Sequence, residues 1–313
     1  MNKYRSILMK IIVVWIGVTL IASGVIHFNR YTRAKEIAGR WYSKYSTVAH
    51  AMGDIDGHYY TNTLEAFNKH YEAGTRVFEV DFSLTSDNKL VCTHGWQDHK
   101  INRLGIEDGD ESPMSYEEFM SSLVCGMYTP LDIDAVINIM KEHEDIYIIL
   151  DFGADLDFDY ETNIDLIFDL DALMLRNKML IDRFKEVDET LLTRVIPQIY
   201  YEDHYKELDK YYHFENYIYT LYKNFDKTTP KQIMQFVTEN EISVITSNLI
   251  DDQEITTKEV LRQIKNDRTL SKEMALFLHT YDDEKEVNKL YELGYSGIYS
   301  NILDETYFKQ EKE

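Results

Sequence analysis

The chain has 313 residues, of which 44% are hydrophobic, and a formal net charge of -22 at pH 7. This length fits a parallel α/β barrel of about 250 residues with an additional N-terminal segment. The acidic excess argues against a nucleic-acid-binding protein, which needs a basic surface for phosphate contacts, and against binding to an anionic membrane by charge alone.

The first predicted element is a membrane anchor. Ile11 to Ile26 is a mostly apolar run, which Ile7-Leu8-Met9 extends across Lys10 to about 20 residues, enough to cross a bilayer. Basic residues before the run favour a cytoplasmic N-terminus, so we expect a single-pass cell-membrane protein whose catalytic domain is extracytoplasmic. A signal peptide cleaved near Ala22-Ser23-Gly24 is the alternative. The expected division is 1–29 for the cytoplasmic tip and anchor, 30–45 for a juxtamembrane linker or helix, and 46–313 for the barrel.

Three short apolar segments then carry polar side chains at or near their C-terminal ends. Thr47–Ala49 precedes His50, Val77–Phe82 contains Glu79 and Asp81, and Leu90–Thr93 precedes His94. Between the first two segments, Thr63 to Tyr71 has the apolar spacing of an amphipathic helix. This order of strand, helix and strand is typical of the start of an α/β chain.

The polar residues of these segments predict a catalytic site. Glu79 and Asp81 are two residues apart on a predicted strand, so their side chains point to the same face. Two such carboxylates repel each other unless a cation or a shared proton neutralises them, and hard oxygen ligands suit Mg²⁺ or Ca²⁺. His50 and His94 could then flank the metal as general acid and general base. The structural alternative is that these carboxylates pair with nearby basic side chains and the histidines are ordinary rim residues.

The segment resembles the N-terminal signature of the glycerophosphodiester phosphodiesterase family, a branch of the phospholipase-C-like TIM barrels. That signature contains His-Arg-Gly, Glu-Asn-Thr, Glu-x-Asp and His-Asp. The corresponding residues here are His50 with Gly53, Thr61-Asn62-Thr63, Glu79-Val80-Asp81, and His94-Gly95. The resemblance implies that Glu79 and Asp81 bind a divalent metal and that His50 and His94 are the acid–base pair.

The chain departs from this signature at three points. Ala51-Met52 replaces the Arg and adds one residue before Gly53, Thr61 replaces the Glu, and Gly95 replaces the Asp. Loss of the Arg removes a bidentate clamp for phosphate, which bears on phosphate affinity and on the choice of substrate.

A third carboxylate follows the next apolar run. Ile146 to Phe152 is typical of a strand buried on both faces, and Asp151 lies near its end. In the family this strand ends in Glu-x-Lys, and the Glu completes the metal site. The resemblance therefore implies that Asp151 is the third ligand, with Gly153 in place of the Lys. Alternatively, Asp151 caps the segment that follows.

The remaining chain alternates helices and strands, which indicates a TIM (β/α)8 barrel preceded by one transmembrane helix. The expected helices are Glu117–Leu123, Ile133–Glu142, Asn163–Met174 with a further segment Lys178–Lys185, Asp203–Tyr211, Pro230–Glu239, Thr257–Asn266 and Glu284–Leu293. The expected strands are Val195–Tyr200, Tyr217–Leu221, Ser243–Ser247, Ala275–Thr280 and Ser296–Ser300. The count exceeds eight strands by one, and we expect Ser243–Ser247 to be irregular or additional.

The end of the chain resembles the family's ending, an aromatic-Thr strand, a helix and a Gly-Ile-x-Thr-Asp strand. Here His279-Thr280 replaces the aromatic-Thr pair, and Gly297-Ile298-Tyr299-Ser300-Asn301 is the closing strand.

The resemblance implies a metal-dependent phosphodiester hydrolase. Its expected substrates are glycerophosphodiesters, phospholipid headgroups or teichoic-type envelope polymers, and its cofactor is Ca²⁺ or Mg²⁺. The sequence identifies no substrate-binding residues and does not assign the acid and the base between the two histidines. Two alternatives stay open: a phosphatidylinositol-type phospholipase C or sphingomyelinase-like lyase, and a catalytically weakened barrel that binds phosphorylated glycans or lipids.

Overall fold

The computed structural model describes residues 39–106, 112–152, 158–159, 164–165, 169–221, 228–249 and 253–305, together with Trp15 and Val18. The chain divides into two units, Met1–Lys44 and Tyr45–Glu313. Apart from Trp15 and Val18, the predicted transmembrane segment lies outside the described residues. None of the helices formed by described residues is long and apolar enough to span a bilayer. Of the expected juxtamembrane helix, the structure describes α2 (Trp41–Lys44).

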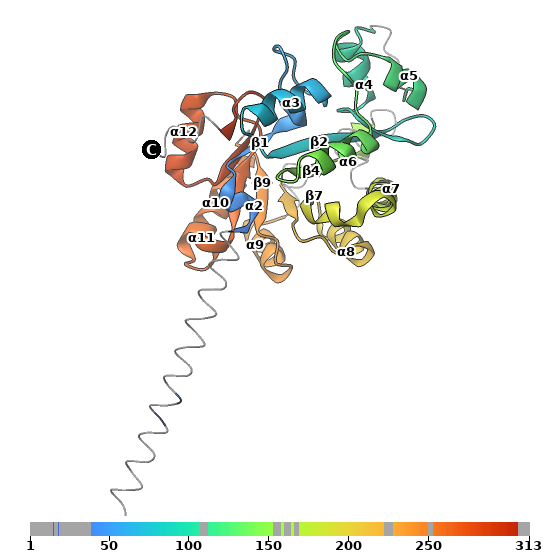
Figure 1. Cartoon of the computed structure of the whole chain (residues 1–313). Helices are drawn as coiled ribbons and strands as arrows, with labels where there is room; N and C mark the ends of the chain where they lie inside the picture. Colours follow the sequence, from blue (N-terminus) through green and yellow to red (C-terminus); the bar gives the residue numbers. More distant parts are fainter. Residues whose placement is uncertain are drawn as a thin grey trace, which may run out of the picture. The chain divides into compact units, whose positions relative to one another are not determined.

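The second unit is a closed barrel (Figure 1). Within its described residues, eight strands run parallel, and β1 pairs with both β11 and β2, so that the barrel has no free edge. In the order of their pairing, the strands are β1 (Thr47–Ala49), β2 (Val77–Leu84), β4 (Tyr147–Asp151), β7 (Val195–Ile199), β8 (Ile218–Thr220), β9 (Val244–Ser247), β10 (Ala275–Leu278) and β11 (Gly297–Ser300). The predicted TIM barrel is confirmed.

Helices surround this barrel (Figure 1). They are α3 (Leu64–Glu72), α6 (Ile133–Glu142), α7 (Leu170–Asp188), α8 (Glu202–Tyr211), α9 (Pro230–Glu239), α10 (Gln253–Asn266), α11 (Leu270–Glu273) and α12 (Glu284–Leu293). Local signals fix their ends: Thr229 and Gln232 form a capping box before α9, and Gly294 ends α12 in the left-handed conformation. The bounds of α6, α9 and α12 in the structure are the same as those predicted from the sequence.

An insert, described over residues 85–106 and 112–128, leaves the barrel after β2. Its strand β3 (Leu90–Cys92) pairs antiparallel with the end of β2, and α4 (Trp96–Asp98), the short helix His99–Arg103 and α5 (Tyr116–Ser121) follow. Figure 1 shows α4 and α5 to one side of the ring of helices. The insert has its own small core of Val91, Trp96 and Phe119, and Trp96 Nε1 donates a hydrogen bond to the carbonyl oxygen of Leu84, 2.9 Å away.

Two expectations about elements are wrong. Segment 243–247 is not an addition, because β9 lies inside the barrel between β8 and β10, and the additional strand is β3. The helix predicted over Asn163–Met174 begins only at Leu170, where the Asp169 carboxylate caps it, and continues through the segment 178–185. Residues Ile164–Asp165 instead form a strand, β6, paired with β5 (Phe158–Asp159).

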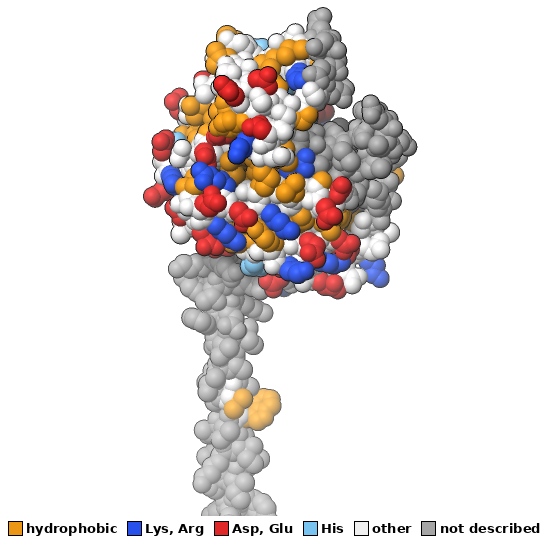
Figure 2. Space-filling view, turned by 90° about the vertical axis from the view of Figure 1, so that its right-hand side faces the viewer, with side chains coloured by type: hydrophobic (Ala, Val, Ile, Leu, Met, Phe, Trp, Pro, Cys, Tyr) orange, Lys and Arg blue, Asp and Glu red, His pale blue; other side chains and the backbone are white. Residues whose placement is uncertain are grey.

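The surface of the barrel unit carries both signs of charge. On the face shown in Figure 2, the described acidic and basic side chains are interspersed with hydrophobic ones. Some form ion pairs between neighbouring helices, such as Arg183 of α7 with Asp134 of α6, whose atoms are 2.7 Å apart. Such exposed pairs contribute roughly 0–1 kcal/mol each, so the stability of the fold rests mainly on its core.

Candidate active site

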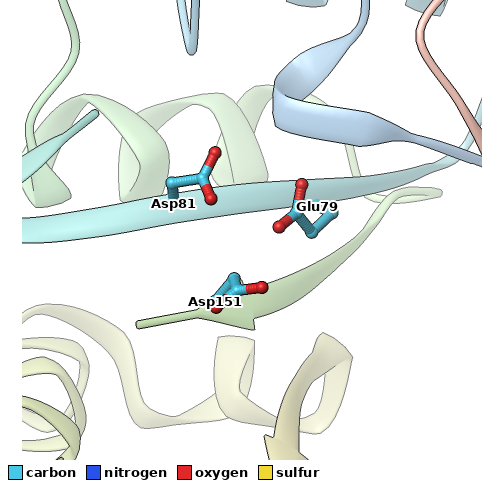
Figure 3. A group of neighbouring side chains, drawn as sticks. All are labelled: Glu79, Asp81 and Asp151. Carbon is cyan, nitrogen blue, oxygen red and sulfur yellow. The ribbon is translucent and has the colours of Figure 1, made fainter. Parts of the chain in front are cut away.

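Three carboxylates converge at the C-terminal ends of two adjacent barrel strands. Glu79 and Asp81 lie on β2, and Asp151 lies on β4 directly opposite Asp81 in the register. One ligand oxygen from each residue lies within 4.8 Å of the others, and Figure 3 shows the three carboxylates facing one another. All three side chains are buried. The C-terminal face of a TIM barrel is where such enzymes place their active sites.

This arrangement makes ionisation of Glu79 and Asp81 unfavourable without a cation. Burial raises the pKa of Glu79 well above its usual range, and the neighbouring carboxylates of Asp81 and Asp151 raise it further. Burial likewise raises the pKa of Asp81 to about 6. A divalent cation would remove this cost, since it stabilises the ionised forms of all three groups.

The surrounding groups hold the carboxylates in place. Asn62 donates from Nδ2 to Asp81 Oδ2 at 2.8 Å and accepts from the Asp81 amide at 3.1 Å. Tyr200 donates to Asp151 Oδ1 at 2.6 Å, and Gln198 donates to Asp151 Oδ2 at 2.9 Å. Partners of this kind orient metal ligands and tune their basicity.

The segment after β1 contacts Glu79 through its backbone. Ala51 and Met52 adopt positive φ values of 47° and 66°, and the Ala51 amide donates to Glu79 Oε2 at 2.6 Å. Ala51 and Met52, which stand in place of the family's Arg, thus form a strained turn. The conformational free-energy cost is roughly 1–3 kcal/mol for each residue in the left-handed region. That turn supplies one hydrogen-bond donor to the site.

The residues present fit a divalent cation. Glu79 Oε1 is fully buried and has no hydrogen-bond partner among the described residues, although a buried polar atom without a partner is costly. The set of donors, three carboxylates, is the hard oxygen chemistry that Mg²⁺ and Ca²⁺ prefer. Glu79, Asp81 and Asp151 are therefore the residues that would hold the ion.

Both predicted histidines lie beside Tyr60. The ring centroid of Tyr60 is 4.6 Å from that of His50 and 4.6 Å from that of His94. His50 directly follows β1, as expected, and is buried. The expectation that His94 lies at the end of a barrel strand is wrong, because β3 pairs antiparallel and belongs to the insert. The turn back toward β2 nevertheless brings His94 to the site.

Several residues of the site were not predicted as functional. Tyr60 contacts both histidines, Asn301 contacts His50, and the ring centroid of His279 is 4.5 Å from that of His50. Gln198 and Tyr200 could have been found, since Gln198 lies on β7 and Tyr200 directly follows it, with the same two-residue spacing as Glu79 and Asp81 on β2. Tyr60 lies in a turn with a positive φ of 56°, and no sequence pattern marks it.

The fold and site together define a phosphodiesterase barrel. The model of the glycerophosphoryl diester phosphodiesterase family matches residues 55–305, and the chain belongs to this family of phosphoric diester hydrolases. The match begins after His50, consistent with the departures in the first motif. No curated protein matches the chain significantly.

Solved structures of the same family share the fold. The chain is similar to a glycerophosphodiester phosphodiesterase from Parabacteroides distasonis, with 18% identity, a TM-score of 0.59, and coverage of 85% of this chain and 95% of that one. It is also similar to an Oleispira antarctica phosphodiesterase in complex with the product sn-glycerol-3-phosphate, with 13% identity, a TM-score of 0.58, and coverage of 87% and 99%. A Thermotoga maritima glycerophosphodiester phosphodiesterase has 17% identity, a TM-score of 0.52, and coverage of 86% and 98%.

Proposed function

We propose that the chain is a metal-dependent phosphodiesterase that cleaves glycerophosphodiester-type substrates by acid–base catalysis with His50 and His94. The observation that carries this proposal is the convergence of three buried carboxylates on one spot at the barrel mouth, with two histidines that both contact one tyrosine ring. Family membership supports the reaction type.

Each group has a chemical task in this proposal. A divalent cation held by Glu79, Asp81 and Asp151 would polarise a phosphoryl oxygen and offset negative charge in the transition state. One histidine accepts the proton of the attacking hydroxyl, which belongs either to the substrate or to water. The other histidine protonates the departing alkoxide. The high pKa of Tyr60, about 12 because of burial and the nearby carboxylates of Asp81 and Glu79, keeps its hydroxyl neutral.

The family and one relative support the proposed substrate class. The Oleispira antarctica enzyme binds sn-glycerol-3-phosphate as its product, so a glycerol phosphate is the first candidate for one half of the substrate. Phospholipid headgroups and teichoic-type polymers carry the same unit. The apolar run from Ile11 to Ile26 supports a membrane anchor that would hold the barrel near such substrates.

A turnover assay tests this function. Full-length protein in detergent is incubated with glycerophosphocholine, with a phospholipid, and with bis(4-nitrophenyl) phosphate, each with Ca²⁺, Mg²⁺ or a chelator. We expect metal-dependent release of product, and a loss of turnover by a factor of about 10²–10⁴ when His50 or His94 is replaced by Ala. Glu79→Ala should abolish the metal dependence together with the activity.

Three results would count against the proposal. Full activity of both histidine variants would exclude acid–base catalysis by these residues. A folded protein without turnover on any substrate or metal would favour a binding protein, in line with the missing Arg and Lys of the family signature. A cyclic phosphate as the final product would instead indicate a lyase of the phospholipase C type.

A further inference from the structure

Tyr60 lies between the groups that would act on the substrate. Its ring centroid is 4.6 Å from that of His50, at an interplanar angle of 80°, and 4.6 Å from that of His94, at 56°. General acids and bases have to reach the attacking and leaving oxygens, so a bound phosphate has to lie within reach of both histidines. A ring in contact with both histidines is therefore beside the reacting phosphate.

The hydroxyl of Tyr60 is available to a ligand. It makes no hydrogen bond with another residue that the structure describes, and the side chain is only partly exposed. Burial raises the pKa of this hydroxyl to about 12, and of the charged groups around it the carboxylates of Asp81 and Glu79 raise it most. The hydroxyl therefore keeps its proton beside the carboxylates of the candidate metal site, and it can donate a hydrogen bond there.

The chain lacks the two cations with which the family signature would bind phosphate. Ala51-Met52 stands in place of the Arg, and Gly153 stands in place of the Lys. The Ala51 amide is not a replacement, because it already donates to Glu79 Oε2 at 2.6 Å. The non-bridging oxygens of a phosphodiester accept hydrogen bonds, so a site without these cations requires another donor.

The backbone of Tyr60 is held in place by the insert and by the metal-ligand set. Arg103 Nε donates to the Tyr60 carbonyl oxygen at 3.4 Å, and Arg103 Nη2 is 3.1 Å from Asp98 Oδ2, with only 11% of the Arg103 side chain exposed. Two positions further on, Asn62 donates to Asp81 at 2.8 Å. Tyr60 itself has a φ of 56°, a conformation that persists in a non-glycine residue only where the surroundings fix it.

We propose that Tyr60 is a further catalytic residue, whose hydroxyl donates a hydrogen bond to a non-bridging oxygen of the phosphate in place of the family's Arg. Arg103 is a positioning residue, since it acts through the backbone of Tyr60 and not on the substrate. This inference rests on the proposed function and adds to it a group that binds the phosphate itself.

The hydrogen bond assists the reaction without transfer of a proton. Negative charge on the non-bridging oxygens is redistributed as the attacking oxygen approaches phosphorus, and a donor that is already in place stabilises that charge without reorganisation. No bond of Tyr60 forms or breaks, and its hydroxyl is still protonated after the product leaves. The two proton transfers of the reaction stay with His50 and His94.

Tyr60→Phe deletes the hydroxyl and keeps the ring that contacts both histidines. We expect kcat to decrease about 10²–10³-fold with little change in KM. The loss should be the same on glycerophosphocholine and on bis(4-nitrophenyl) phosphate, because both share the non-bridging oxygens and differ in the leaving group. Tyr59→Phe, at the neighbouring residue with 41% exposure, is the matched control and should keep wild-type activity. Wild-type kcat in Tyr60→Phe, or a loss on glycerophosphocholine alone, would overturn the inference.

Sulfur substitution tests whether the hydroxyl contacts the phosphate. Sulfur accepts hydrogen bonds only weakly, so the wild type should turn over bis(4-nitrophenyl) phosphorothioate more slowly than the phosphate. In Tyr60→Phe the ratio of the two rates should be smaller, since the hydrogen bond that sulfur weakens is already absent. A role of Tyr60 in packing alone would leave this ratio unchanged, and an unchanged ratio would refute the contact.

Arg103→Gln tests the positioning role. It should lower kcat about 10–100-fold, because a displaced hydroxyl stabilises the transition state less. In the Tyr60→Phe background the same change should cause no further loss, since the group that Arg103 positions is then missing. Equal losses in both backgrounds would overturn the role. Arg183→Gln, which breaks an exposed ion pair between α6 and α7, is the control and should be active.

A binding measurement separates this inference from the proposed function. If the wild type had no turnover with any substrate or metal, the proposed function would fail, and titration calorimetry of the full chain with sn-glycerol-3-phosphate and Mg²⁺ would still test Tyr60. Tyr60→Phe should bind this phosphate about 10-fold more weakly than the wild type or Tyr59→Phe. Equal affinities of wild type and Tyr60→Phe, or no binding by the wild type, would refute the inference.

Discussion

The buried carboxylates predict an unusual pH dependence of stability in the absence of metal. The pKa of Asp81 rises from 3.8 to about 6 on folding because the carboxyl group is buried. The folded state therefore binds more protons than the unfolded state between these values, and stability decreases as the pH rises through this window. At 1.36 kcal/mol per pKa unit, the loss from Asp81 is about 3 kcal/mol. The raised pKa of Glu79 acts in the same direction.

Thermal unfolding of the full chain measures this effect. A loss of about 3 kcal/mol corresponds to a decrease in Tm of roughly 6–12 °C for a domain of this size. With chelator present, Tm should therefore be higher at pH 5 than at pH 8. At pH 8, Ca²⁺ or Mg²⁺ should raise Tm by binding only the folded state, whereas at pH 5 protons compete with the metal and the increase should be small.

Two variants separate this effect from general changes in surface charge. Asp81→Asn cannot ionise, so the chelated variant should be more stable than the chelated wild type at pH 8, and metal should raise its Tm less. Asp203→Asn, at an exposed position of α8, is the matched control and should behave like the wild type. A chelated wild type with the same Tm at pH 5 and pH 8 would show that burial does not raise the pKa of Asp81 in the folded state.

Three further changes test the surroundings of the site. Tyr200→Phe removes the hydrogen bond to Asp151 and leaves the Phe152 amide without its acceptor; calorimetric titration should show metal affinity reduced about 10–100-fold. Gly53→Ala places a Cβ atom 2.2 Å from the His70 ring at a φ of +91°, and urea unfolding should show a loss of more than about 1 kcal/mol. Trp96→Ala empties the core of the insert, so limited proteolysis should cut the insert first while the barrel stays intact. Three results would contradict these expectations: unchanged metal affinity in Tyr200→Phe, unchanged stability in Gly53→Ala, and an insert in Trp96→Ala that is cut no faster than in the wild type.

The barrel was predictable because its strands and helices have strong local signals. The continuous apolar run at Ile146–Leu150 marks a strand buried on both faces, and the Thr229-Pro230 pair marks the start of a helix. The direction in which a short strand pairs has no such signal. Leu90–Cys92 has the composition of a barrel strand, and only its antiparallel pairing with β2 places it in the insert.

Only part of the site could be predicted from the sequence. Glu79 and Asp81 are close in the chain, so the alternation of a strand brings them together. Asp151 could be added because it ends the next buried strand. Asn301 is 251 positions from His50 along the chain, and their contact exists only because β11 closes the barrel against β1. Contacts that depend on closure cannot be found from local patterns.

The two proposed catalytic histidines follow strands that are packed differently. His50 directly follows the barrel strand β1, whereas His94 follows β3, whose Val91 packs with Trp96 and Phe119 of the insert and whose Leu90 and Cys92 pack in the barrel core. Because β3 joins the two clusters, a change in the packing of the insert can alter the position of His94, while the three carboxylates stay on the barrel strands β2 and β4.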